Sequence, residues 1–106
     1  MAEIIRKVKE KMSLTNDYWN SKLLAEIGSM KIRHRIVCGK SSNLHQHDMA
    51  VEAFFILEGT MVIEVEGEKN SLVSGDFVKI NSGEKHRIIV DDVVSLLVID
   101  NINSEK

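Results

Sequence analysis

The chain has 106 residues, of which 43% are hydrophobic and 28% charged, and its formal net charge is -2. These values are typical of one soluble globular domain and give no electrostatic reason to expect a nucleic-acid partner. The single cysteine, Cys38, excludes an intramolecular disulfide, which fits a reducing compartment. The N-terminus lacks the apolar segment of a secretory signal, and the longest apolar stretch, Val93 to Ile99, is too short to cross a bilayer. We therefore expect a cytoplasmic protein with no membrane association.

Residues 1–20 give no decisive pattern, because their aliphatic side chains fit one face of a short helix as well as the start of an edge strand. A turn is expected over residues 16–20. We treat residues 1–20 as an N-terminal extension of a single domain, 1–106, whose core spans about residues 22–100.

The rest of the chain is a series of short alternating or apolar segments separated by Gly, Asn and Asp turns, among them Gly59-Thr60 and Gly67-Glu68. Strands are expected over residues 22–27, 30–38, 52–58, 61–66, 71–73, 77–80, 86–90 and 93–99. Eight or nine short strands of this kind predict an all-β, antiparallel sandwich or barrel.

The expected strand over residues 30–38 has the clearest alternation. One face carries Met30, Ile32, His34, Ile36 and Cys38, and the other carries Lys31, Arg33 and Arg35. We expect the apolar set to point inward. His34 then either contacts the functional site or is a buried histidine bonded to the backbone, and Cys38 is either a reactive thiol or a small core residue. The cationic row is expected to be a solvated strand face, with an anion-binding stripe as the alternative.

Four side chains have the spacing of a metal site. His45 and His47 point to the same side of an extended segment, Glu52 follows five positions later, and His86 begins another strand. Only a closed or strongly curved sheet brings His86 to the other three. Three imidazoles and a carboxylate suit one divalent Fe, Mn, Ni, Cu or Zn ion, and an octahedral shell leaves two positions open for water or substrate.

These residues also match a known pattern in two parts. The first part is Gly39, five residues, His45-Gln46-His47, four residues, Glu52, six residues and Gly59. The second part is Gly75, five residues, Asn81, one residue, Gly83, two residues and His86. The chain thus resembles a small single-domain cupin, most closely those labelled mannose-6-phosphate-isomerase-related. Asn81 stands where the second motif usually has proline, and Val90 where it often has asparagine.

The resemblance implies a jelly-roll barrel, often dimeric, with its metal held by His45, His47, Glu52 and His86. Parity along the strands then predicts the pocket wall, which comprises Phe54, Ile56, Met61, Ile63, Ile88 and Val90 together with His34 and Cys38. Residues 93–99 are apolar on both faces, so a partner subunit is expected to cover the outer face in a homodimer.

Two hypotheses of function remain open. The first is a metal-dependent dioxygenase, isomerase or lyase acting on a small chelating molecule, with Glu52 as a possible proton shuttle. The second is a non-catalytic or sensory cupin that binds a small ligand. Parity places no Lys or Arg inside the barrel, which argues against a phosphosugar substrate unless Lys40 or Lys85 reaches the mouth.

Overall fold

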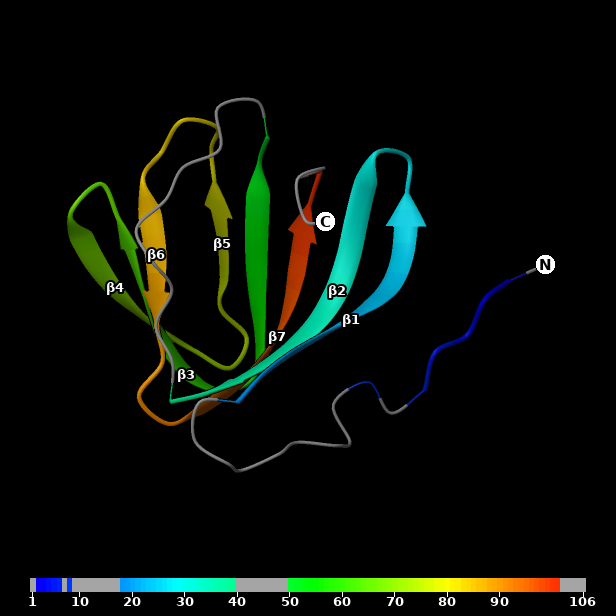
Figure 1. The fold of residues 1–106 in the computed structure, drawn as a ribbon, viewed down its shortest axis with the longest axis horizontal. Coiled ribbons are helices and arrows are strands. Elements are labelled where there is room, and N and C mark those ends of the chain that lie inside the picture. Colours follow the sequence, from blue (N-terminus) through cyan, green and yellow to red (C-terminus); the bar gives the residue numbers. More distant parts are fainter. Residues whose placement is uncertain (1, 7, 9–17, 40–49, 102–106) are drawn as a thin grey trace.

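The computed structural model describes residues 2–6, 8, 18–39 and 50–101, and every strand pair among them is antiparallel. The strands are β1 (Tyr18–Ile27), β2 (Met30–Cys38), β3 (Glu52–Val65), β4 (Glu68–Val73), β5 (Phe77–Ile80), β6 (His86–Ile89) and β7 (Val93–Asp100) (Figure 1). The described residues contain no helix, and so none that could span a membrane. The predicted all-β fold is confirmed.

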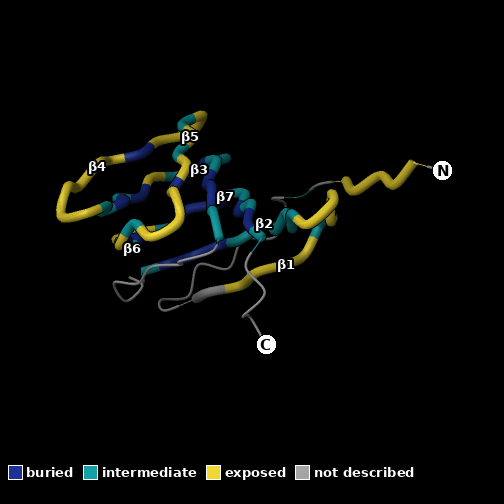
Figure 2. Tube along the Cα trace, turned by 90° about the horizontal axis from the view of Figure 1, so that it is seen from above, coloured by how far each residue is buried: buried dark blue, intermediate teal, exposed yellow. Residues whose placement is uncertain are grey.

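The long strand β3 connects two sheets. Its first half pairs with β7 and β5, and β7 continues through β2 to β1 at the edge. Its second half pairs with β4 on one side and β6 on the other. The two sheets face each other as in a jelly roll, and buried positions gather along β2, β3 and β7 between them (Figure 2).

Gly59 lies where β3 leaves one sheet for the other. The backbone at Gly59 has φ +91, and a Cβ there would collide with the carbonyl oxygen of Val93. Only glycine allows both the positive φ and this close approach. The expected turn at Gly59-Thr60 is therefore wrong, because the two strands predicted on either side are one continuous strand, β3.

The core between the sheets is a single aliphatic cluster with one aromatic ring. Its members are Val37, Phe54, Ile56, Met61, Ile63, Leu72, Ile80, Ile88, Val90, Val94, Leu96 and Val98. Inward positions alternate along β3, β6 and β7 as period-two patterning requires. The parity predicted for β3 and β6 is therefore correct.

The parity predicted for β2 is wrong. Arg33 and Arg35 lie opposite Val98 and Leu96 of β7, and residues directly opposite in an antiparallel pair point to the same side. Both partners belong to the core cluster, so the arginines share the inner face with Val37. The face predicted to point inward, that of His34, Ile36 and Cys38, is the outer face of this sheet.

The outer face of β2 is nevertheless buried. Ile36 is 3% exposed and Ser95, opposite it on β7, is fully buried within the single chain. An apolar outer face was the reason to expect a homodimer. At these positions one chain already covers that face, so the face does not by itself require a partner.

The strand β1 begins earlier than expected. Tyr18, Trp19 and Asn20 pair with Cys38, Val37 and Ile36, so the turn expected over residues 16–20 is wrong for its last three positions. The remaining strand boundaries agree with expectation to within a few residues. The β3–β4 hairpin turns at Glu66-Gly67, both with positive φ, one position before the predicted turn.

Candidate metal centre

Glu52 and His86 meet at one end of the sandwich. Glu52 opens β3 and His86 opens β6, and both strands start at the upper edge in Figure 1. The Oε1 atom of Glu52 accepts a hydrogen bond of 3.0 Å from Nε2 of His86. Both residues are buried, with 7% and 1% of their surface exposed. A carboxylate and an imidazole from distant parts of the chain therefore face each other inside the fold.

Local bonding fixes the orientation of the His86 ring. Its Nδ1 donates to the carbonyl oxygen of Glu84 at 2.9 Å, so both ring nitrogens have an acceptor. Burial by itself lowers the pKa of His86, but the hydrogen bonds to Glu52 and Glu84 and the charges of both residues outweigh burial and raise it. In the absence of metal, the pair is stabilised as imidazolium and carboxylate.

The same bonding suits metal binding at His86. A histidine that donates Nδ1–H to a carbonyl offers a metal the lone pair of Nε2 once the Nε2 proton has left. The hydrogen-bond partner of Nε2 at 3.0 Å is a carboxylate oxygen of Glu52, and carboxylates bind divalent first-row metals together with imidazoles. These two groups therefore fit a metal ion once His86 has given up the proton on Nε2.

The start of β3 is held by the end of β7. Asn101 accepts a hydrogen bond from the backbone N–H of Val51 at 3.0 Å, and Asp100 lies directly opposite Glu52. Asp100 is 2% exposed and accepts from Arg33, whose Nη1 lies 3.3 Å from each carboxylate oxygen. A second, partly buried ionic pair thus lies next to the Glu52–His86 pair on the inner face.

The other two predicted ligands, His45 and His47, lie outside the described residues. Within residues 2–6, 8, 18–39 and 50–101, no three His, Cys, Asp or Glu side chains are grouped to hold a metal ion. The structure therefore brings together two of the four predicted ligands and leaves the full set a prediction.

The predicted pocket residues divide into two groups. The apolar ones, Phe54, Ile56, Met61, Ile63, Ile88 and Val90, all point inward and are at most 3% exposed as members of the packed core. His34 and Cys38 do not face this core, because they lie on the outer face of β2. Their prediction as pocket residues is a consequence of the reversed β2 parity.

His34 forms a buried polar pair on that outer face. Its Nε2 lies 2.7 Å from the hydroxyl of Ser95, and burial followed by the charge of Lys22 lowers its pKa. The expected buried histidine is correct, but its partner is a side chain rather than the backbone. Cys38 is buried, as expected for a small core residue.

Sequence patterning missed Arg33 and Asp100 as residues of this region. Asp100 follows the apolar run of β7, and a buried carboxylate at that position needs a cation on a neighbouring strand. The register pairs β7 with β2, whose only charged residues are the cationic row. The sequence signal for this ion pair was Asp100, a charged residue that continues the inward-facing series of Val94, Leu96 and Val98.

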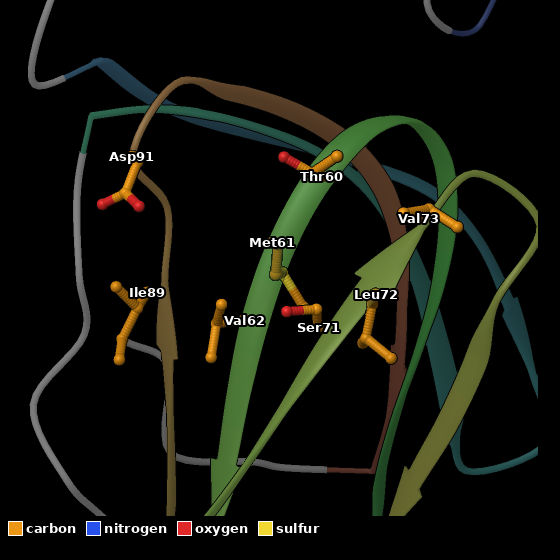
Figure 3. A pocket seen from close by; sticks show the side chains of 8 residues that line it. All are labelled: Thr60, Met61, Val62, Ser71, Leu72, Val73, Ile89 and Asp91. Atoms are coloured by element: carbon orange, nitrogen blue, oxygen red, sulfur yellow. The ribbon is translucent and has the colours of Figure 1, made fainter.

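A separate depression of about 280 Å³ lies on the outer face of the β4–β3–β6 sheet (Figure 3). It is lined by Thr60, Met61, Val62, Ser71, Leu72, Val73, Ile89 and Asp91. Val62 lies opposite Ser71 on β4 and opposite Ile89 on β6, and all three point away from the core. This depression is distinct from the Glu52–His86 pair.

The family model for the cupin domain matches residues 33–100. The chain belongs to the cupin family. Among curated proteins, none matches the chain. Many solved structures share this cupin's fold.

A cupin-2 domain protein from Shewanella frigidimarina is 24% identical over 81% of this cupin and 83% of its own chain, with a TM-score of 0.72. KdgF from a Halomonas species is 18% identical over 78% of this cupin and 84% of its own chain, with a TM-score of 0.71. A candidate sugar phosphate isomerase from Acidithiobacillus ferrooxidans is 28% identical over 67% of this cupin, with a TM-score of 0.61. The match spans only 49% of that last chain. These likenesses support the cupin fold.

Proposed function

We propose that this cupin holds one divalent metal ion through His45, His47, Glu52 and His86, and that it is an enzyme acting on a small molecule that chelates this metal. The observation that carries the proposal is the buried Glu52–His86 contact of 3.0 Å. His47 is five residues before Glu52 in the chain, so a tight bend through residues 48–51 would bring it to the same site.

The ligand types suit Fe, Mn, Ni, Cu or Zn, and four protein ligands leave two positions of an octahedral shell for substrate. When bound, such an ion supplies Lewis-acid polarisation of a substrate oxygen or a centre for oxygen chemistry. Residues of the chain supply the shielding from water and the orientation of the ligands. Glu52 and His86 are shielded from water, with 7% and 1% of their surface exposed, and the Glu84 carbonyl orients the imidazole.

Glu52 is the residue that we propose to move a proton. Its carboxylate already accepts a hydrogen bond inside the fold, and it lies among buried neighbours. As a metal ligand, Glu52 would leave the metal transiently in order to take a proton from a bound substrate and return it elsewhere, as a general base requires.

The inner-face position of Arg33 and Arg35 reopens one class of substrate. The reason to set phosphosugars aside was the expected absence of cations inside the barrel, and the register places two arginines on that face. The name of one structural neighbour, a candidate sugar phosphate isomerase, agrees with an isomerase of this class. Dioxygenase and lyase reactions are the other two reaction types that we propose for this enzyme.

The second candidate function is a non-catalytic cupin that binds a small ligand. Fold alone does not separate it from an enzyme. The two are distinguished by incubating the metal-loaded protein with a panel of enols, oxo acids and sugar phosphates while oxygen consumption and product formation are followed. Turnover with or without oxygen supports an enzyme, and Glu52→Gln should abolish it. Ligand-dependent thermal stabilisation without turnover supports the binding module and contradicts the proposed enzyme.

We also propose a cytoplasmic homodimer that contacts neither nucleic acid nor membrane. Size-exclusion chromatography with light scattering tests the dimer, and a mass of one chain contradicts it.

A further inference from the structure

Two carboxylates that take no part in the proposed function bond to the loop in front of His86. Residues 81–85 join β5 to β6, and His86 is the first residue of β6. Glu66 reaches this loop from the hairpin turn after β3, and Glu84 belongs to the loop itself. Because the loop leads directly into His86, the bonds that hold the loop also bear on the direction of the imidazole.

Glu66 extends the β3–β6 pairing by one position with its side chain. The last strand pair is Val65 opposite His86. Beyond it, the N–H of Glu66 donates to the carbonyl oxygen of Lys85 at 2.8 Å, and the N–H of Lys85 donates to Oε2 of Glu66 at 2.6 Å. Opposed residues of an antiparallel pair exchange two such bonds between their backbones. Here a carboxylate replaces one backbone carbonyl, and a charged acceptor strengthens the bond.

The backbone conformation of Glu66 is unfavourable for a glutamate. Its φ is +50, and it is the one non-glycine residue with a positive φ in the part of the chain that the structure describes. Glycine adopts such a φ without steric cost, and glycine, asparagine and aspartate are the usual residues of this kind of hairpin turn. A turn built for stability alone would have one of them here. The exception therefore indicates that the Glu66 side chain has a task, and its bond to Lys85 is that task.

Glu84 closes the loop on itself. Its Oε1 accepts from the N–H of Asn81 at 2.8 Å, and its own N–H donates to the Asn81 carbonyl oxygen at 3.2 Å. Asn81 stands where the second cupin motif usually has proline, and proline has no N–H to donate. In this chain a pair of hydrogen bonds thus restricts the loop at the position where the motif usually relies on the proline ring.

The bonds of the loop end on the imidazole. The carbonyl oxygen of Glu84 accepts from Nδ1 of His86 at 2.9 Å, and Nε2 of the same ring donates to Glu52 at 3.0 Å. Glu66 and Lys85 are exposed, whereas His86 is 1% exposed. A series of bonds therefore runs from the surface of the protein to the buried ring.

We propose that Glu66 and Glu84 are positioning residues, which fix the loop so that the Glu84 carbonyl holds the His86 ring with Nε2 directed at the metal. This inference rests on the proposed function, because the metal is what the fixed ring serves. It predicts that metal affinity depends on a surface carboxylate that does not touch the metal. Groups bonded directly to a metal-bound histidine typically change metal affinity by about tenfold or more. Glu66 acts through the loop, so we expect about fivefold.

The first test is the Mn²⁺ affinity of four variants, measured by calorimetric titration. Glu66→Gly removes the acceptor at a position whose φ glycine adopts freely, and Glu84→Ala removes the bond to Asn81 but keeps the carbonyl that His86 needs. Each should bind Mn²⁺ about fivefold more weakly. Glu66→Gln keeps a side-chain oxygen of the same reach and should stay within about twofold of wild type. So should Glu68→Gln, since the Glu68 carboxylate has no hydrogen bond or ion pair with residues 81–86 in the described structure.

The second test uses metal-free protein. Magnetisation transfer in NMR measures how fast the Nδ1–H proton of His86 exchanges with water, and the exchange should be about fivefold faster in Glu66→Gly and unchanged in Glu66→Gln. The backbone amide of Leu96, a core residue with no exposed surface, reports global unfolding. Its hydrogen–deuterium exchange should change less than that of the ring proton, because Glu66 acts on the loop and not on the core.

Failure of this inference and failure of the metal site give different results. If wild type and Glu66→Gly bind Mn²⁺ equally, or if the His86 ring proton exchanges at the same rate in both, the positioning role is contradicted and the metal site stands. Equal acceleration at His86 and Leu96 also contradicts it, because Glu66 would then stabilise the whole fold. If wild type binds no Mn²⁺, the metal site fails. The ring-proton rates then still decide whether Glu66 fixes the imidazole.

Discussion

The imidazole of His86 and the carboxylate of Glu52 lie 3.0 Å apart inside the fold, although 34 residues separate them in the chain. Their meeting depends on β3, which brings Glu52 into one sheet and pairs with the strand of His86 in the other. Any disturbance of the path of β3 should therefore disturb the site. Several consequences of this geometry can be measured.

Metal-free protein should become less stable as pH rises above about 6.5. The folded state raises the pKa of His86, so its ion pair with Glu52 contributes fully below the unfolded pKa and is lost as pH passes through the folded pKa. Urea unfolding in the presence of a chelator at a series of pH values measures this slope, which His86→Gln should remove. With divalent metal present the slope should reverse, because metal binding displaces the proton. An identical slope in wild type and variant would contradict the ion pair.

His34, on the outer face of β2, should give stability the opposite dependence on pH. Burial and the charge of Lys22 lower the pKa of His34, so below about pH 6.5 the unfolded chain takes up a proton that the folded chain resists. The free energy of unfolding should therefore fall between pH 7 and pH 5. His34→Gln keeps a side-chain partner for Ser95 without titrating, and should make the free energy of unfolding less dependent on pH. An equal fall in the variant would show that His34 is not responsible.

Gly59 should be the least replaceable glycine of the described strands. Alanine there meets both the positive φ and the carbonyl of Val93, and we expect a loss of at least about 4 kcal/mol or failure to fold. The control is Gly75→Ala, with φ +93 but open space around the added Cβ, which should cost about 1 kcal/mol from backbone strain alone. Chemical unfolding of both variants measures the difference, and equal losses would show that the close approach is unimportant.

Much of this fold follows from the sequence alone. The inward parity of Phe54, Ile56 and Ile88 was predictable because their strands alternate around one apolar face. The spacing from Glu52 to His86 also required a curved sheet, and the structure provides it through β3.

The orientation of β2 was not predictable by the same rule. Hydrophobic patterning assigns the more apolar face to the core, and in β2 that face is the one with His34 and Ile36. Both faces of this strand are buried, since Ile36 and Val37 are 3% and 0% exposed. The choice between faces came from partners on β7, where Asp100 compensates Arg33, and a pairing of that kind is not visible within a single strand.

The central claim is that Glu52 and His86 belong to a metal site. Its most direct test is the metal content of protein reconstituted with Mn²⁺ or Zn²⁺ and freed of excess ion, for wild type, His86→Gln and His34→Gln. The last variant is matched, because it also replaces a buried histidine with a side-chain hydrogen bond, but on the outer face. We predict one ion per chain in wild type and His34→Gln, and a loss of at least tenfold in affinity in His86→Gln. Unchanged metal content in His86→Gln would contradict the account.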